Sequence, residues 1–186
     1  MEADWEFEIG VDAPVIDTCW PGLIDLRQHP ERICELAEAV QSPPLAEALI
    51  KLNSSASPVG TSKCDLWPIL DPAEFDADEM DAAQQAALQA VACYIDLLFH
   101  GEAQWSAPDQ AEAACKRLVA QLRAIPLRGC RVDLVIRRAL LAPGQESLGA
   151  TAYLTACGPS LSQAEAVLGT ALAAFADSVC GQSKLQ

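Results

Sequence analysis

The sequence predicts an α+β fold, a two-layer sandwich in which a largely antiparallel sheet of about four to six strands carries helices on one face. Segments that alternate between apolar and polar residues, as half-buried strands do, are separated by segments whose apolar residues recur at helical spacing. Their order is strands, helices, strand, helices, hairpin and helix. No internal repeat or shift in composition divides the 186 residues, so we expect a single globular domain over residues 1–186.

The first predicted strand is DWEFEIGVD, residues 4–12. Apolar side chains at every second position, from Trp5 to Val11, alternate with acidic ones, which predicts a strand with an acidic outer face. PVIDTCW, residues 14–20, predicts a second extended segment. LIDLR, residues 23–27, predicts either a third short strand or an irregular connection.

Two short helices are predicted next. Pro30 suits the first position of one helix, and Ser42 with the two following prolines opens the other. NSSASPVGTS, residues 53–62, predicts a loop, and KCDLWPIL, residues 63–70, predicts a strand limited by Pro68. The predicted buried residues are Ile33, Leu36, Ala37 and Val40 in the first helix, and Leu45, Ala48, Leu49 and Leu52 in the second.

Three further helices are predicted from apolar residues at helical spacing. The first is long, over residues 78–100, with acidic residues in its first turn. The second begins after Ser106 with Pro108, and the third opens at Ser160 with Gln163 three residues later. The predicted inward residues are Ala83, Ala87, Val91, Tyr94, Ile95 and Leu98; then Ala111, Cys115, Leu118, Leu122 and Ile125; then Val167, Leu168, Ala171, Leu172, Phe175 and Val179.

A hairpin is predicted over residues 131–158, with a three-residue turn at residues 143–145. Because side chains alternate along a strand, the apolar residues of its two strands share one face and the polar residues share the other. Pairing Arg137 with Thr151 sets apolar residues opposite each other, whereas a shift of one residue would mix the faces. The apolar face then holds Val132, Leu134, Ile136, Ala150, Ala152, Leu154 and Ala156.

The polar face of this hairpin is the predicted binding site. Its guanidinium, hydroxyl and phenol groups are those that bind an anion or a small molecule, although a solvated outer sheet face would carry the same groups. Arg138 falls on the apolar face. Either its stem lies over apolar surface while its head reaches water, or it pairs with a buried carboxylate. The predicted ligand-binding residues are Arg131, Asp133, Arg137, Thr151, Tyr153, Thr155 and Cys157.

Charge is unevenly distributed along the chain, whose formal net charge is −14. Residues 1–26 and 65–81 each carry seven acidic residues and no Lys or Arg, whereas residues 116–138 carry seven cations and one acid. Either these acidic segments fold over the basic segment, or a basic stripe faces outward and binds an anionic ligand or an acidic protein segment. The negative charge disfavours nucleic acid and membrane partners. No signal peptide and no apolar run of membrane-spanning length is visible, so we expect a cytoplasmic protein.

The reactive side chains follow no pattern typical of an enzyme. The eight cysteines stand alone, without metal-ligand spacing, so we expect reduced thiols, no metal ion and no cofactor. Residues 71–81 are acidic but lack the spacing of a calcium loop. Neither His29 nor His100 is brought to a cysteine by any pattern, and His100 is expected to end a helix as an imidazolium.

Two functions are consistent with these features. The first is a non-catalytic binding or accessory protein, a homodimer, that uses the polar sheet face or an exposed strand edge. The second is a small enzyme acting on an anionic metabolite at the same face. In it Arg131, Arg137 and Tyr153 would bind the substrate, and Asp133 or Cys157 would carry out the chemistry.

Overall fold

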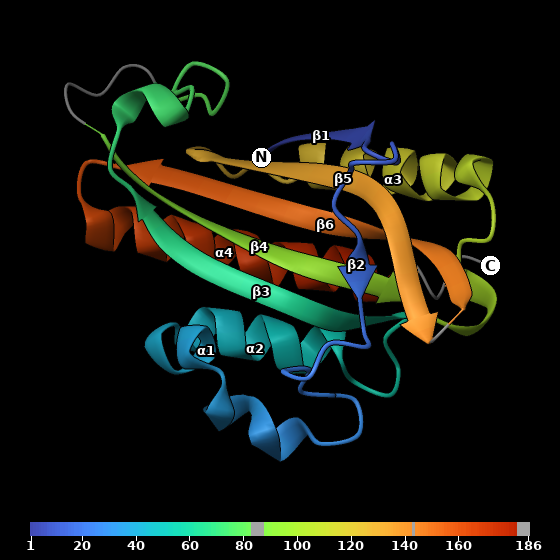
Figure 1. Cartoon of the computed structure of the whole chain (residues 1–186). Helices are drawn as coiled ribbons and strands as arrows, with labels where there is room; N and C mark the ends of the chain where they lie inside the picture. The colour runs from blue at the N-terminus through green and yellow to red at the C-terminus, as the bar shows by residue number, and fades with distance from the viewer. Residues whose placement is uncertain (83–87, 143, 182–186) are drawn as a thin grey trace.

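The computed structural model describes residues 1–82, 88–142 and 144–181, and it has the predicted α+β architecture, with a six-stranded sheet in one layer and helices in the other (Figure 1). Five strands follow the order β1-β5-β6-β4-β3, and the short β2 also pairs with β5. β1 and β2 run parallel to β5, and the other neighbours are antiparallel. The strands are β1 (Glu2–Phe7), β2 (Ile16–Asp17), β3 (Val59–Ile69), β4 (Gln89–Phe99), β5 (Cys130–Ala142) and β6 (Gln145–Gly158).

The α-helices lie on one side of the sheet (Figure 1). Helix α4 packs against β6 and β4, α3 packs against β1, and α2 lies between α4 and β3. The main hydrophobic core fills the space between these two layers. The α-helices are α1 (Ala37–Gln41), α2 (Pro43–Leu52), α3 (Pro108–Arg123) and α4 (Leu161–Gly181), and the 3₁₀ turns are Pro30–Glu35, Pro72–Glu74 and Gly101–Ala103.

Three of the predicted helices, α2, α3 and α4, are confirmed with their buried faces. The Ser42 side chain accepts a hydrogen bond from the Leu45 amide and so caps α2, and Pro108 is the first residue of α3. At the start of α4 the Ser160 hydroxyl accepts a bond from the Gln163 amide. Leu49, Leu118 and Phe175 are among the buried residues that these three apolar stripes predicted.

Helix α4 corrects one expectation about membranes. By length and composition alone its 21 residues could cross a bilayer, although we expected no run of that length. Its small and apolar residues instead pack against the sheet and α2, with Ala164, Leu168, Leu172 and Phe175 buried. A helix that packs on a sheet carries apolar residues on the face that it buries.

The first predicted strand and the first predicted helix are shorter than expected. β1 ends at Phe7, so the side chains of Ile9 and Val11 are 41% and 92% exposed. The helix predicted after Pro30 is a 3₁₀ turn followed by the five-residue α1, and Val40 is exposed rather than buried. Residues 14–20 contribute only the two residues of β2, and residues 23–27 form an irregular connection without a strand.

The long helix predicted over residues 78–100 is wrong where the structure describes it, because residues 89–99 form the strand β4. The predicted positions Ala83 and Ala87 lie outside the described residues. β4 pairs with β3 on one side and β6 on the other, and nearly all its residues are buried. After its first residue, and apart from Tyr94 and Asp96, both faces of β4 are apolar, because the segments with Ile16 and Met80 cover the two ends of its second face and remove the alternation of apolar and polar residues there. Its continuous apolar run therefore matched helical spacing as well as a strand.

The neighbouring strand β3 begins at Val59, so it includes the last four residues of the predicted loop over residues 53–62. It continues through Pro68 to Ile69. Proline cannot donate a ladder hydrogen bond, and β3 is the last strand of the sheet, where one side of the backbone has no strand partner among the residues that the structure describes.

The hairpin of β5 and β6 has the predicted faces but a register that differs by two residues. Arg137 lies opposite Gly149, and Thr151 lies opposite Val135. A shift of two residues keeps every side chain on its predicted face. Ala142 pairs with Gln145, so the turn is tighter than the predicted three residues, and Gly144 adopts the positive φ of 78° that such a turn requires.

Candidate functional site

The sheet face turned away from the helices carries the predicted binding residues, and we call its central part the open face. Two segments cover the ends of this sheet face. Ile16 packs on Leu98 and Ala139 at one end, and Met80 packs on Ala90 and Cys157 at the other. The open face between them comprises Asp65 and Trp67 of β3, Tyr94 and Asp96 of β4, Thr151, Tyr153 and Thr155 of β6, Arg131, Asp133, Val135 and Arg137 of β5, and Glu2, Asp4 and Glu6 of β1.

Arg137 is the centre of a hydrogen-bonded cluster on the open face. Its Nε and Nη2 donate to one carboxylate oxygen of Glu8, at 2.9 and 2.5 Å. Its Nη1 donates to the Thr151 hydroxyl at 2.9 Å and to the Tyr153 hydroxyl at 3.1 Å. Burial alone would lower the pKa of the guanidinium, but the bonds to Tyr153 and Glu8 outweigh it and raise the pKa. The side chain is 12% exposed, so this cation is fixed in one position.

Gly149 lies opposite Arg137 in the ladder, where its neighbours approach closely. A Cβ at this position would lie 2.6 Å from the Leu97 carbonyl oxygen and 3.0 Å from Ile16 Cδ1. The close approach of the β4 backbone, and next to it of Ile16, therefore requires glycine here.

Arg131 is also held by carboxylates. Its Nε lies 2.9 Å from both carboxylate oxygens of Asp133, and its Nη1 lies 2.5 Å from Glu79. The bond to Asp133 raises the pKa of Arg131 more than burial lowers it. Both guanidinium groups of the predicted site are thus occupied by carboxylates of this same chain.

A row of side chains crosses the five main strands at one level of the open face. Tyr94 and Tyr153 are opposite each other at its centre, with ring centroids 6.0 Å apart. Asp65 lies beside Tyr94 on one side, and Asp133 followed by Asp4 lies beside Tyr153 on the other. Two tyrosine rings are therefore flanked by carboxylates at both ends of the row. Trp67, in the next row, has its ring 6.3 Å from that of Tyr94.

Asp96 is a residue of this face that the sequence analysis did not identify. It is 7% exposed, and its Oδ1 accepts a 2.6 Å hydrogen bond from the Thr151 hydroxyl. Burial raises the pKa of the Asp96 carboxyl, while the Thr151 bond and the charge of Arg137 partly oppose this shift. The sequence feature that could have identified it is a single acid within the apolar run CYIDLLF. The helix predicted over these residues placed Asp96 outside its inward face, so it was not considered.

The seven predicted site residues are thus partly brought together. Arg131, Asp133, Arg137, Tyr153 and Thr155 are half-buried on the open face. Thr151 is fully buried within the cluster. Cys157 is separated from the others because it lies under Met80 in a small apolar cluster, and burial raises the pKa of its thiol.

The acidic segments fold over the basic segment, as one of the two charge hypotheses predicted. Glu8, Glu79 and Asp81 form ion pairs with Arg137, Arg131 and Arg128, in that order. Within the described residues no carboxylate lies within 4 Å of the Arg138 guanidinium, and its buried Nε has no hydrogen-bond partner. The carboxylate pairing considered for Arg138 is therefore not found in the part of the chain that the structure describes.

The cysteines and histidines form no catalytic pair in the described ranges. All eight cysteines are free thiols, and burial raises the pKa of Cys93 and Cys115 to about 12. His100 follows a strand rather than a helix, which corrects its predicted role. Partial burial and the charge of Arg27 lower the pKa of His100, so the neutral imidazole is favoured.

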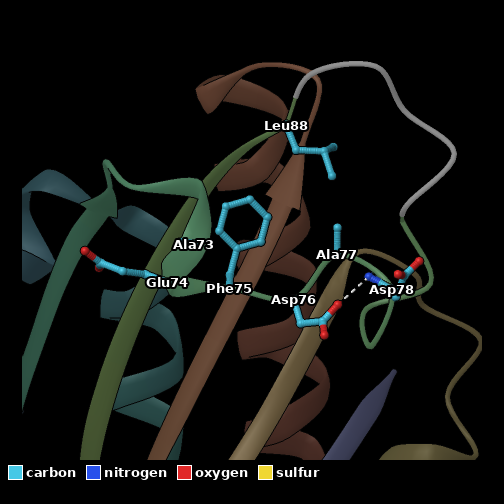
Figure 2. A pocket seen from close by; sticks show the side chains of 7 residues that line it. All are labelled: Ala73, Glu74, Phe75, Asp76, Ala77, Asp78 and Leu88. Carbon is cyan, nitrogen blue, oxygen red and sulfur yellow. Dashed lines mark hydrogen bonds between the residues drawn. The ribbon is translucent and has the colours of Figure 1, made fainter.

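An open pocket of about 420 Å³ lies next to the segment that covers Cys157 (Figure 2). It is lined by residues 73–78 and Leu88, including three acidic side chains. Figure 2 shows Asp76 turned toward Asp78, whose amide donates to the Asp76 carboxylate at 2.8 Å, while Glu74 extends away from both. Over residues 1–82, 88–142 and 144–181, no group of three or more His, Cys, Asp or Glu is arranged to hold a metal ion.

No protein-family model, curated protein or solved structure matches this chain. Evidence about its function therefore comes from the residues and geometry described above.

Proposed function

We propose that the protein is a non-catalytic binding protein that holds a partner on the open face of its sheet. The observation that carries this proposal is a hydrogen-bonded cluster around Arg137 that fixes this part of the sheet, next to aromatic rings that are partly exposed. Arg137 holds Glu8, Thr151 and Tyr153 in place, while Tyr94, Tyr153 and Trp67 keep part of their surface exposed. Rings that are already positioned lose little entropy on binding, and aromatic residues are enriched at binding surfaces.

The alternative function is a small enzyme acting on an anionic metabolite. The raised pKa of Asp96, beside Thr151, favours it, because shifted carboxyl groups gather at active sites. Two observations count against it. An anionic substrate would have to displace Glu8 from Arg137 and Asp133 from Arg131. The Cys157 thiol is buried, and its raised pKa disfavours the nucleophilic thiolate.

Site-specific photo-cross-linking tests the binding role. A photo-reactive residue would replace Thr155, which is half-buried on the open face, or Glu165, which is exposed on α4. We expect cross-linked products of defined mass from position 155 in cells of the source organism, and not from position 165. The same products from both positions, or none from position 155, would overturn the proposed role.

The homodimer also stays a proposal, and we assign it to the free edge of β3 rather than to the open face. β3 is the last strand of the sheet, and an unpaired edge can add a strand from another chain. Light scattering should give twice the 19.8 kDa mass of one chain. A mass of one chain at micromolar concentration would overturn it.

A further inference from the structure

The charges of the open face indicate which kind of partner it fits. The open face and the charged residues next to it hold three cations, Arg131 and Arg137 on the face and Lys63 near Asp96, against eight carboxylates. Six carboxylates lie on the face and two pair with its arginines: Glu2, Asp4, Glu6, Asp65, Asp96 and Asp133, then Glu8 and Glu79. The excess is negative even after every cation has been counted against one acid. Two copies of this face, or this face and a nucleic acid, would therefore repel each other.

The carboxylates that lack an ion pair lie where a cation could reach the tyrosine rings. Among the described residues five of these carboxylates form no salt bridge: Glu2, Asp4, Glu6, Asp65 and Asp96. Asp4 and Asp65 are exposed at the two ends of the tyrosine row. Two further exposed acids, Glu2 and Glu6, lie on the same side of β1 as Asp4.

Asp96 supplies an independent observation in the same direction. It is more than nine-tenths buried, yet its carboxylate receives one hydrogen bond, from Thr151, and the nearby Lys63 lies over the Trp20 ring, 5.3 Å from its centroid. A buried carboxylate without a contacting cation generates a negative potential at the surface above it. That potential lies beside the Tyr94 and Tyr153 rings, whose faces also attract cations.

We propose that the open face binds an extended, lysine- or arginine-bearing segment of a partner protein, with its cationic side chains over Tyr94 and Tyr153 and against the flanking carboxylates. This inference rests on the proposed binding function and names the chemistry of the partner. Neighbouring strands are about 4.8 Å apart, so the row from Asp65 to Asp4 spans roughly 19 Å. An extended segment of about six residues covers that length, with alternate side chains directed at the sheet.

The test is fluorescence anisotropy with a labelled ten-residue peptide of alternating lysine and serine, at 0.15 M salt, where distant charges are largely screened. The first variant carries Asp4→Asn and Asp65→Asn. Its matched control carries Glu47→Gln and Glu165→Gln, which remove the same charge from exposed positions on the helices. We expect roughly tenfold weaker binding for the first variant and less than about twofold for the control.

A third variant, Tyr94→Leu, separates ring recognition from charge. The Tyr94 hydroxyl has no hydrogen bond within the described residues, so leucine removes the ring, with its contacts to Trp67 and Tyr153, and breaks no hydrogen bond. We expect about two- to fivefold weaker binding of the lysine peptide. Circular dichroism of each variant checks folding. If this variant does not fold, the exposed aspartate variants still decide the question.

Four outcomes would overturn the inference. Equal losses in the two double variants would show unspecific attraction to an acidic protein. Tighter binding of a glutamate–serine peptide would favour the anionic ligand. Displacement of the lysine peptide by spermine at equal charge concentration would favour a free polyamine over a polypeptide. Cross-linking from position 155 without preference for the lysine peptide would leave the binding role in place and refute the cationic partner alone.

Discussion

The clearest test of the open face is the substitution Arg137→Met, because this buried guanidinium joins three elements of the structure. It is 12% exposed and donates to Glu8 before β2, and to Thr151 and Tyr153 on β6. Methionine fills a similar volume but leaves these acceptors without their donor.

The expected loss is about 2–3 kcal/mol in the free energy of unfolding. Breaking a fully buried ion pair costs about 3–5 kcal/mol. Glu8 is 43% exposed and can be hydrated again, which reduces the loss. Thr151 keeps its bond to Asp96. The melting temperature of a chain of this size should fall by roughly 5–10 °C.

Urea unfolding followed by circular dichroism measures this loss, and Arg128→Met is the matched control. The Arg128 and Asp81 side chains are 82% and 67% exposed, and exposed pairs contribute about 0–1 kcal/mol. Equal losses for the two variants, or a loss below about 0.5 kcal/mol for Arg137→Met, would refute the fixed cluster.

Three further predictions concern stability and reactivity. Burial raises the pKa of the Asp96 carboxyl in the folded state. The contribution of this carboxyl to stability is therefore fully present below its pKa in the unfolded chain, and it is lost as pH rises through its pKa in the folded protein. Asp96→Asn should therefore be more stable than the native protein at pH 7, with a difference that vanishes in acid; a pH series of urea midpoints checks this. Leu97→Ala should lower the free energy of unfolding by about 2–5 kcal/mol, because Leu97 is buried in β4; the predicted helix would have placed it outside the inward stripe. Val40→Ala at an exposed site is the control, and equally small losses for the two variants would contradict the strand. Ellman's reagent should label the exposed Cys19 and Cys34 quickly in the folded protein and the four buried thiols only on unfolding, so rapid labelling of all eight would contradict the packing.

The fold could be predicted from the sequence wherever one periodicity was unambiguous. α2, α3 and α4 combine capping signals with an apolar stripe, and β5 and β6 alternate between apolar and polar side chains over residues 130–134 and 150–156. β4 could not be predicted in this way. Its burial depends on Ile16, which is far from it in sequence, and on Met80 in the preceding segment, and these tertiary contacts erase the alternation of a strand.

The site shows the same dependence on distant contacts. Arg137, Thr151 and Tyr153 could be placed together, because a hairpin sets faces from local sequence and a two-residue error in register does not change them. Tyr94 and Asp96 could not be placed, since they belong to the strand that was predicted as helix. The pairing of Glu8 with Arg137 joins residues 129 positions apart. The charge distribution along the sequence left two alternatives open, namely that the acidic segments fold over the basic segment or that the basic segment faces outward.

The pairing of Glu8 with Arg137 links the stability of the fold to the sign of the charge on its surface. Glu8, Glu79 and Asp133 bind the two guanidiniums that would otherwise make the hairpin face attractive to anions. The same bonds fix the segment after β1, and the loop that covers Cys157, to β5. A ligand that took Arg137 from Glu8 would therefore loosen the fold, whereas a cation at Asp4, Asp65 or Asp96 would leave every described ion pair intact. The arrangement that stabilises the sheet thus also favours a cationic partner.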